Sequence, residues 1–218
     1  LGYWRFEVRD AASYYGLGER FDVLDHAHTV VKNLSVDNEG VKGSSSYKPM
    51  PFYMSTTGYG LWVDTGGEAT FDMNASDRDE VIVDMTTDRL RIVLFTGPEF
   101  PEILKNFTAQ TERAILPPYW AFAPWKSRDY YQNDAQVKED VDKTRELGLP
   151  GSVIVIDSPW AETYNDYKFN PKQFADAPGM VKYLHEQGFK LVLGHTPWID
   201  SKSDQPKEPG FEGKIAPL

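Results

Sequence analysis

Residues 119–198 contain three short apolar runs, which read YWAFAPW at 119–125, VIVI at 153–156 and LVLG at 191–194. The runs begin about 35 residues apart, and charged amphipathic segments fill the intervals. Short continuous apolar runs that alternate with helical patterns are typical of βαβ units with a parallel sheet. Each run is apolar at consecutive positions, as expected for a strand that is covered on both faces. The stretch therefore predicts an α/β domain.

Polar and aromatic residues follow each run, and they indicate where chemistry would occur. The three following segments read KSRD at 126–129, DSPW at 157–160 and HTPW at 195–198. Functional groups of parallel α/β proteins gather at the carboxyl ends of the strands. Asp157 is therefore the first candidate, since it ends an otherwise apolar strand. A structural alternative is an Asp that caps the turn into Ser158–Pro159.

Helices are predicted between these strands. Asn133 can cap a helix that runs to about Leu147, where Gly148 and Pro150 stop it. A second helix is predicted from about Pro178 to Gln187. The segment 161–171 between the second strand and this helix is long and dense in aromatic and polar residues, which favours a loop that faces substrate.

The first half of the chain has a different pattern. Short strands are predicted over residues 1–9, 50–56, 59–64, 69–74, 80–85 and 90–96, with turn residues between them. Many short strands at this spacing predict a β-sandwich. Gly16 and Gly18 indicate a tight turn or a close approach of two backbones. A short helix is expected over 101–109, and the double proline at 117–118 marks the boundary between domains 1–112 and 113–218.

Composition limits the function. The chain has 218 residues, a net charge of −10 and no cysteine. The negative charge argues against nucleic acid or an anionic membrane as a partner, and the sequence has no apolar run long enough to span a bilayer. Nothing in the sequence indicates a metal or an organic cofactor. Aromatic residues make up 14% of the chain, a composition that suits the apolar faces of sugar rings but also builds cores.

Three parallel strands do not close a barrel. A (β/α)₈ barrel needs eight strands and about 250 residues, and the last of the three strands would keep an unpaired edge. We therefore expect the chain to be a piece of a larger enzyme. The alternative is a small open α/β domain.

The sequence resembles glycoside hydrolase family 31, the retaining α-glucosidase and α-xylosidase family. The resemblance covers nearly the whole chain in order, and its specificity comes from the order and spacing of several motifs. These motifs are YGLGERF at 15–21, PFYMST at 51–56, GYGLWV at 58–63, IDSPW at 156–160, NPKQF at 170–174, GMV at 179–181 and TPWI at 196–199. The resemblance implies the latter part of a galactose-mutarotase-like β-sandwich, followed by the first three βα units of a (β/α)₈ TIM barrel.

The resemblance also implies roles for individual residues. Asp157 would bind sugar hydroxyls in the −1 subsite, and Asp37 would reach over the active site from a sandwich loop. The family often has Trp-Asn-Arg-Asp at that loop, whereas this chain has Leu-Ser-Val-Asp at 34–37. Trp125 would line the pocket after the first strand, with Trp160 near it.

One position departs from the family pattern. Family members commonly carry Trp in the third strand where this chain has Gly194. The glycine would enlarge the pocket or let His195 or Trp198 replace the missing wall. His195 is therefore a candidate for substrate contact, and a histidine packed inside the barrel is the alternative.

Retaining glycosidases use two carboxyl groups about 5–5.5 Å apart, one as nucleophile and one as acid/base. The family places both on later barrel segments, so they are expected beyond Leu218, and the rest of the barrel would be required for activity. The sequence thus predicts part of a retaining α-glycosidase that acts on a carbohydrate. The alternatives are a non-catalytic carbohydrate-binding module, and a transglycosylase or lyase of the same family. The sequence does not indicate a cellular compartment.

Overall fold

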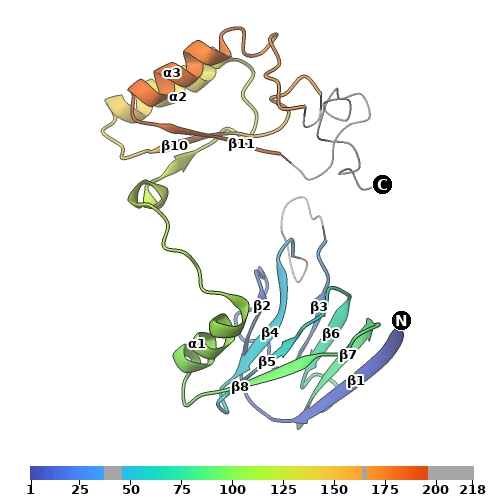
Figure 1. Cartoon of the computed structure of the whole chain (residues 1–218). Helices are drawn as coiled ribbons and strands as arrows, with labels where there is room; N and C mark the ends of the chain where they lie inside the picture. The colour runs from blue at the N-terminus through green and yellow to red at the C-terminus, as the bar shows by residue number, and fades with distance from the viewer. Residues whose placement is uncertain (37–45, 164–165, 196–218) are drawn as a thin grey trace. The chain divides into compact units, whose positions relative to one another are not determined.

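The structure is a computed structural model, and it describes residues 1–36, 46–163 and 166–195. The chain divides into two compact units, Leu1–Ala114 and Ile115–Leu218 (Figure 1). The first unit is built from antiparallel strands and one α-helix, whereas the second contains parallel strands and two α-helices.

The first unit is a sandwich of two four-stranded sheets. One sheet has the order β1-β7-β6-β3 and the other has the order β2-β4-β5-β8, and all neighbours are antiparallel. The strands are β1 Gly2–Arg9, β2 Tyr14–Gly18, β3 Thr29–Asn33, β4 Pro49–Ser55, β5 Tyr59–Val63, β6 Ala69–Met73, β7 Glu80–Thr87 and β8 Ile92–Thr96. The predicted β-sandwich is therefore confirmed, and β4 and β5 pair as a hairpin.

The core of the sandwich follows from alternation along the strands. In β7 the residues Val81, Val83 and Met85 point inward, while the residues between them are partly exposed. Tyr14 and Tyr53 from the facing sheet are fully buried, and their rings meet edge to face at 5.7 Å. Aromatic rings thus pack among the aliphatic side chains of this core.

Two glycines let strands β2 and β4 approach closely. Gly16 has φ +128° and Gly18 has φ +89°, and the register between β2 and β4 shifts between them. A Cβ at Gly16 would lie 2.6 Å from Phe52 O, and one at Gly18 would overlap with Lys48 O. Of the two roles predicted for these glycines, the structure shows a close backbone approach at a β-bulge within a strand.

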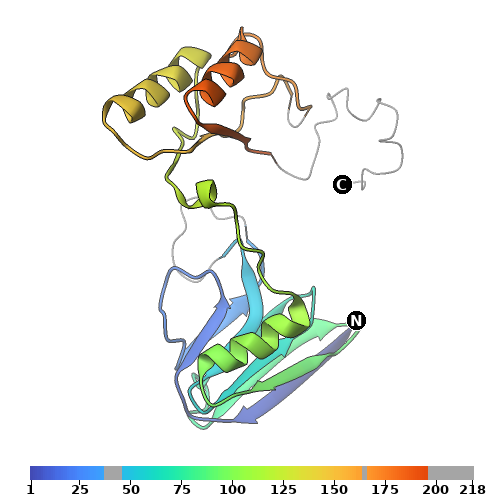
Figure 2. The same cartoon turned by 60° about the vertical axis from the view of Figure 1, so that its left-hand side comes forward.

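Helix α1 (Phe100–Thr111) covers the outer side of one sheet. Its Ile103 and Phe107 are buried against Phe52 and Phe95 of that sheet, and the rings of Phe52 and Phe107 stack at 4.0 Å. Figure 2 shows the helix lying across the strands. The prediction of a helix at 101–109 is confirmed, with one residue more at its start and two more at its end.

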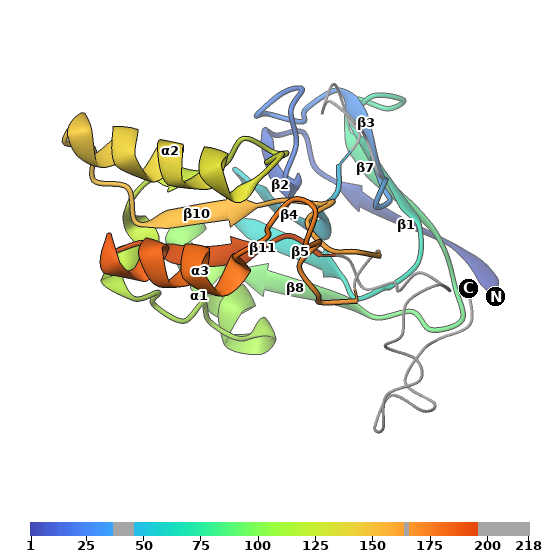
Figure 3. The same ribbon diagram turned by 90° about the horizontal axis from the view of Figure 1, so that it is seen from above.

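The second unit is a three-stranded parallel sheet with both helices on one face. Strands β9 (Trp125–Lys126), β10 (Val153–Ile156) and β11 (Lys190–Leu193) lie in the order β11-β10-β9. Helices α2 (Asp134–Glu146) and α3 (Ala177–Glu186) run side by side over the sheet (Figures 1 and 3). This arrangement agrees with the predicted βα units of a parallel α/β domain.

The helices of this unit begin at capping side chains. Asn133 accepts a hydrogen bond from the Gln136 N–H at 3.0 Å, and Asp176 accepts one from the Gly179 N–H at 3.0 Å. Val137 and Val141 of α2, together with Met180 and Leu184 of α3, are buried against the sheet. The predicted bounds of both helices hold to within a residue or two.

The first apolar run differs from its prediction. Tyr119–Phe122 forms the 3₁₀-helix η1, and the strand comprises only Trp125 and Lys126. Pro117, Pro118 and Pro124 explain the difference, because proline lacks the N–H that a strand ladder needs. Trp125 is therefore at the beginning of a strand, whereas the sequence pattern placed it at the end of one.

Candidate functional site

The carboxyl ends of β10 and β11 form the candidate site. Ile154 and Ile156 face the helices, so Val155 and the residue two positions later, Asp157, face the other way. Val155 pairs with Val192 in the register of the sheet, which places Gly194 beside Asp157. The Gly194 N–H donates to Ile156 O at 2.9 Å and continues the ladder past the end of β11.

The carboxylate of Asp157 is exposed, and one of its two oxygens accepts a hydrogen bond. Its Oδ1 accepts a hydrogen bond from the Ser158 N–H at 2.7 Å. Among the described residues, no group donates to its Oδ2. Asp157 thus also makes the turn contact that the structural alternative predicted, through the Ser158 N–H. One oxygen nevertheless remains available for a ligand hydroxyl.

Gly194 makes room for this carboxylate. A Cβ at position 194 would overlap with Asp157 Oδ1 and would lie 3.1 Å from its Cγ. A larger residue would therefore displace the Asp157 side chain from the position it takes here. The space that Gly194 leaves is filled by the carboxylate itself.

Trp160 is buried and contacts the backbone of Gly194. It is 3% exposed, and its indole N–H donates to Gly194 O at 2.7 Å. Its ring packs against Phe169 with 5.1 Å between ring centroids. The structure places Trp160 beside Gly194 and within the core of the unit, away from Trp125, near which it was expected. Its predicted contact with substrate remains a prediction, and the geometry gives it a supporting position.

Trp125 is not brought to Asp157. It pairs with Val153, the first residue of β10, whereas Asp157 follows the last residue of that strand. Its ring stacks on Trp120 at 6.2 Å, and its indole N–H donates to Ala121 O at 3.2 Å. Trp125 is thus half exposed at the amino end of the sheet.

An ion-pair network fixes the segment after β9. The Arg128 guanidinium donates to both oxygens of the buried Asp140, at 2.6 and 2.9 Å, and the Tyr131 hydroxyl donates to Oδ2 at 2.9 Å. Lys126 Nζ lies 3.2 Å from the same Oδ2. Burial alone would raise the pKa of Asp140, but the hydrogen bonds from Arg128, Tyr131 and Lys126 outweigh it and lower that pKa.

His195 and Tyr167 form an exposed aromatic pair just past the carboxyl end of β11. His195 follows Gly194 and is exposed, and its ring meets that of Tyr167 edge to face at 5.8 Å. Tyr167 is 49% exposed and comes from the long loop after β10. The predicted candidate His195 therefore lies at this site. Tyr167 was missed as an individual residue, and only the density of aromatics in its loop pointed to it.

Gln173 joins the loops around the site, a role that was not predicted although the residue lies in the NPKQF motif at 170–174. Its side-chain N–H group donates to Tyr130 Oη at 3.1 Å, to Tyr131 O at 3.3 Å and to Pro159 O at 3.4 Å. These acceptors belong to the segments that follow β9 and β10. A single amide thus ties the two segments together.

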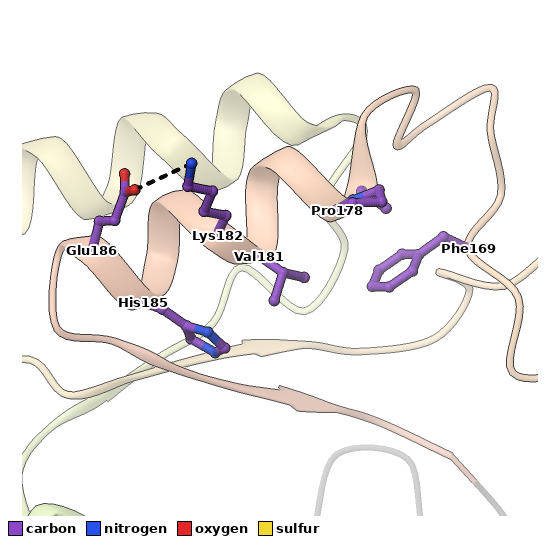
Figure 4. Close-up of a pocket in the computed structure, with 7 residues that line it drawn as sticks. Phe169, Pro178, Val181, Lys182, His185 and Glu186 are labelled. Atoms are coloured by element: carbon purple, nitrogen blue, oxygen red, sulfur yellow. Dashed lines mark ion pairs between the residues drawn. The ribbon is translucent and has the colours of Figure 1, made fainter.

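A separate hollow of about 730 Å³ lies along α3. Figure 4 shows Phe169, Pro178 and Val181 at one part of it, with His185 and the Lys182–Glu186 ion pair toward the end of the helix. Asp157 does not line it. This hollow is therefore distinct from the candidate site, although Phe169 also contacts Trp160.

Two predicted positions, Asp37 and Trp198, lie outside the described residues. Over residues 1–36, 46–163 and 166–195, no cluster of three or more His, Asp or Glu side chains is arranged to hold a metal ion. None of the helices in these same ranges is both long and apolar enough to cross a membrane.

Two family models match the chain in consecutive regions. Residues 3–72 match the glycosyl hydrolase 31 N-terminal galactose mutarotase-like domain, and residues 114–215 match the glycosyl hydrolases family 31 TIM-barrel domain. Their order agrees with the sandwich and the parallel sheet seen in the structure.

Characterised relatives and solved structures agree with these matches. The chain is 30% identical to the α-xylosidase XylQ of Lactiplantibacillus pentosus over 92% of this chain, and 27% identical to an α-glucosidase of Saccharolobus solfataricus over 81%. It spans only 27% and 26% of those two proteins. A family 31 dextranase of Flavobacterium johnsoniae in complex with glucose superposes with a TM-score of 0.87 at 27% identity, over 94% of this chain and 26% of the dextranase. The chain belongs to glycoside hydrolase family 31 and carries part of its N-terminal sandwich and the start of its barrel.

Proposed function

We propose that this chain is part of a retaining α-glycosidase that hydrolyses α-glucosides or related α-linked sugars. Relatives named α-xylosidase, α-glucosidase and dextranase support the class of reaction. The chain would supply substrate-binding residues, and the nucleophile and the acid/base would come from later barrel segments. The sugar is therefore bound partly by this chain and cleaved by carboxyl groups that the chain does not supply.

The observation that carries the proposal is the Asp157 carboxylate at the carboxyl end of β10. It faces away from the helices, on the face that lines the interior of a (β/α)₈ barrel. Its Oδ2 accepts no hydrogen bond from the described residues. An ionised carboxylate accepts short, strong hydrogen bonds from hydroxyls, and such bonds are about twice as strong as neutral ones.

Asp157 would contribute to rate as well as to affinity. Hydrogen bonds to the sugar that strengthen as the ring distorts toward an oxocarbenium-like transition state lower the barrier. His195 would border the same sugar from the adjacent strand end. Asp37 keeps its predicted role above the active site, and Trp160 would act through Gly194, whose carbonyl it holds.

The proposal is tested by hydrolysis of p-nitrophenyl α-glucoside and α-xyloside with the complete gene product. The Asp157→Asn variant keeps the size of the side chain and removes its charge. Hydrogen bonds to a charged group contribute about 1.5–3 kcal/mol, so kcat/KM should fall at least about tenfold. Asp88→Asn is the matched control, because Asp88 is exposed between β7 and β8.

The expected result is hydrolysis of one of the two substrates by the wild type, unchanged by Asp88→Asn and strongly reduced by Asp157→Asn. Product analysis by nuclear magnetic resonance should show release of the α-anomer first, as retention requires. A wild-type protein that folds but cleaves neither substrate, nor isomaltose or maltose, would refute the proposal.

A further inference from the structure

We infer that Tyr167 is a sugar-binding residue, the aromatic surface against which the ring held by Asp157 packs. The inference rests on the proposed function and goes beyond it, since it names a residue and the face of the ligand that it contacts. It also assigns to a tyrosine the role that the sequence suggested for Trp125 and Trp160.

A series of neighbours leads from Tyr167 to Asp157. The Tyr167 ring lies 5.8 Å from the His195 ring, His195 follows Gly194, and Gly194 lies directly against the Asp157 carboxylate. The Tyr167–His195 pair therefore borders the same strand ends as the carboxylate. By contrast, Trp160 is 3% exposed and Trp125 is at the other end of the sheet. Within the described part of the second unit, Tyr167 is the half-exposed aromatic residue whose ring contacts His195, the neighbour of Gly194.

The backbone at Tyr167 is held in an unfavourable conformation. Its φ is +59°, in the left-handed region, where a bulky residue other than glycine is uncommon. Such conformations persist only where the surroundings enforce them, and they concentrate at ligand-binding positions. A glycine would be the expected residue if the turn served the fold alone.

Asp166 enforces this conformation. It is 5% exposed, and its carboxylate accepts hydrogen bonds from the Thr163 N–H and hydroxyl and from the Lys168 N–H, at 2.9 to 3.2 Å. The bridge between Ala161 and Phe169 closes the base of the loop. The buried carboxylate thus fixes the backbone on both sides of Tyr167 and turns its ring outward.

The chemistry identifies the ligand as a pyranose of an α-linked sugar. One face of such a ring presents C–H groups, which pack on an aromatic face, while its hydroxyls reach a carboxylate. The edge-to-face contact with His195 limits rotation of the tyrosine ring, so little conformational freedom is lost on binding.

The test is titration calorimetry of the complete gene product with glucose and with xylose, which the enzyme does not hydrolyse. The variants are Tyr167→Gly, Tyr167→Phe and Asp157→Asn, with Tyr119→Ala as the control because Tyr119 is 95% exposed elsewhere in the unit. Tyr167→Gly should weaken binding about three- to tenfold, the range expected for an aromatic contact. Tyr167→Phe and Tyr119→Ala should stay within about twofold, because the first keeps the ring face and the second lies elsewhere.

Thermal melting separates a ligand role from a structural one. Tyr167→Gly relieves the left-handed strain, so its midpoint should rise by about 2 °C while its affinity falls. Unchanged affinity in Tyr167→Gly, or a lower midpoint, would overturn the inference. If Asp157→Asn abolishes binding while Tyr167→Gly does not weaken it, the proposed function stands and this inference fails. If the wild type binds neither sugar, both fail.

Discussion

The two units of the chain differ in how completely they cover their own apolar surface. In Leu1–Ala114 two sheets share one core, and α1 covers the outer side of the second sheet. In Ile115–Leu218 the helices cover one face of the sheet, and Val155 and Val192 on the other face stay partly exposed. The sandwich therefore covers its apolar faces with its own residues. The described part of the α/β unit leaves one face of its sheet partly exposed, and the proposed sugar site lies at the carboxyl ends of these strands.

The largest expected effect concerns the two units expressed separately. Residues 1–114 should melt in one cooperative transition, because their core is enclosed. Residues 115–218 should melt without a cooperative transition and bind a hydrophobic dye, because three strands with one covered face bury too little apolar area. Differential scanning calorimetry with dye fluorescence measures both. A sharp, dye-free transition for residues 115–218 would remove the contrast between the units.

The next effect concerns the bulge in the sandwich. Gly18→Ala should destabilise the first unit by about 3 kcal/mol, because it adds left-handed strain to a backbone overlap with Lys48 O. Gly66→Ala is the matched control, since a Cβ there would meet no atom within 4 Å. Denaturant unfolding measures both variants. Equal stability of the two would show that β2 and β4 do not need their close approach.

A smaller effect is expected from Asp140 in the second unit. Asp140→Asn should cost about 2 kcal/mol at neutral pH, because it removes the charge that Arg128 and Lys126 share. The folded pKa of Asp140 is lowered, so its contribution is present above about pH 4, the value in unfolded chains, and is lost as the pH falls through the folded pKa.

Unfolding of the wild type and of Asp140→Asn should therefore differ at pH 7 and converge in acid. The measurement is denaturant unfolding of the complete gene product at pH 7, 5 and 3, with Glu146→Gln on the same helix as the control, because Glu146 is exposed. A difference that persists unchanged at pH 3 would show that the lost stability does not come from the ionised carboxylate.

The smallest effect is expected at Gly194. Gly194→Ala should leave stability nearly unchanged and lower kcat/KM about tenfold. The new methyl group overlaps with Asp157 Oδ1, so the carboxylate must move away from its position against the sugar. Gly151→Ala is a useful comparison in the same unit, since its Cβ would meet Thr144 and Phe189 side chains and no part of Asp157. Full activity of Gly194→Ala would mean that the position of Asp157 is not set by its neighbour.

Much of this fold follows from local sequence patterns. The run VIVI at 153–156 is the strand β10, and the Asn133 and Asp176 side chains begin their helices by capping N–H groups three residues ahead. The first apolar run does not form a strand along its length, because Pro117 and Pro118 precede it and Pro124 lies within it, and proline lacks the N–H that a strand ladder needs. That error also misplaced Trp125 relative to Asp157.

The site was harder to predict, because its geometry depends on neighbours that are distant in sequence. Asp157 could be found from its place after an apolar strand. The burial of Trp160 depends on the carbonyl of Gly194, 34 residues away, and the exposure of Tyr167 depends on a turn that Asp166 holds. A tryptophan in the sequence does not show whether its ring will face a ligand or the core.

A crystal structure of the complete gene product with a bound α-linked disaccharide would test the role of Asp157 directly. We predict a sugar hydroxyl within about 2.5–2.7 Å of Asp157 Oδ2, the distance typical of a hydroxyl bound to a carboxylate, with the Tyr167 ring against the same sugar. A structure in which the disaccharide binds elsewhere, while a protein group occupies Asp157 Oδ2, would contradict it.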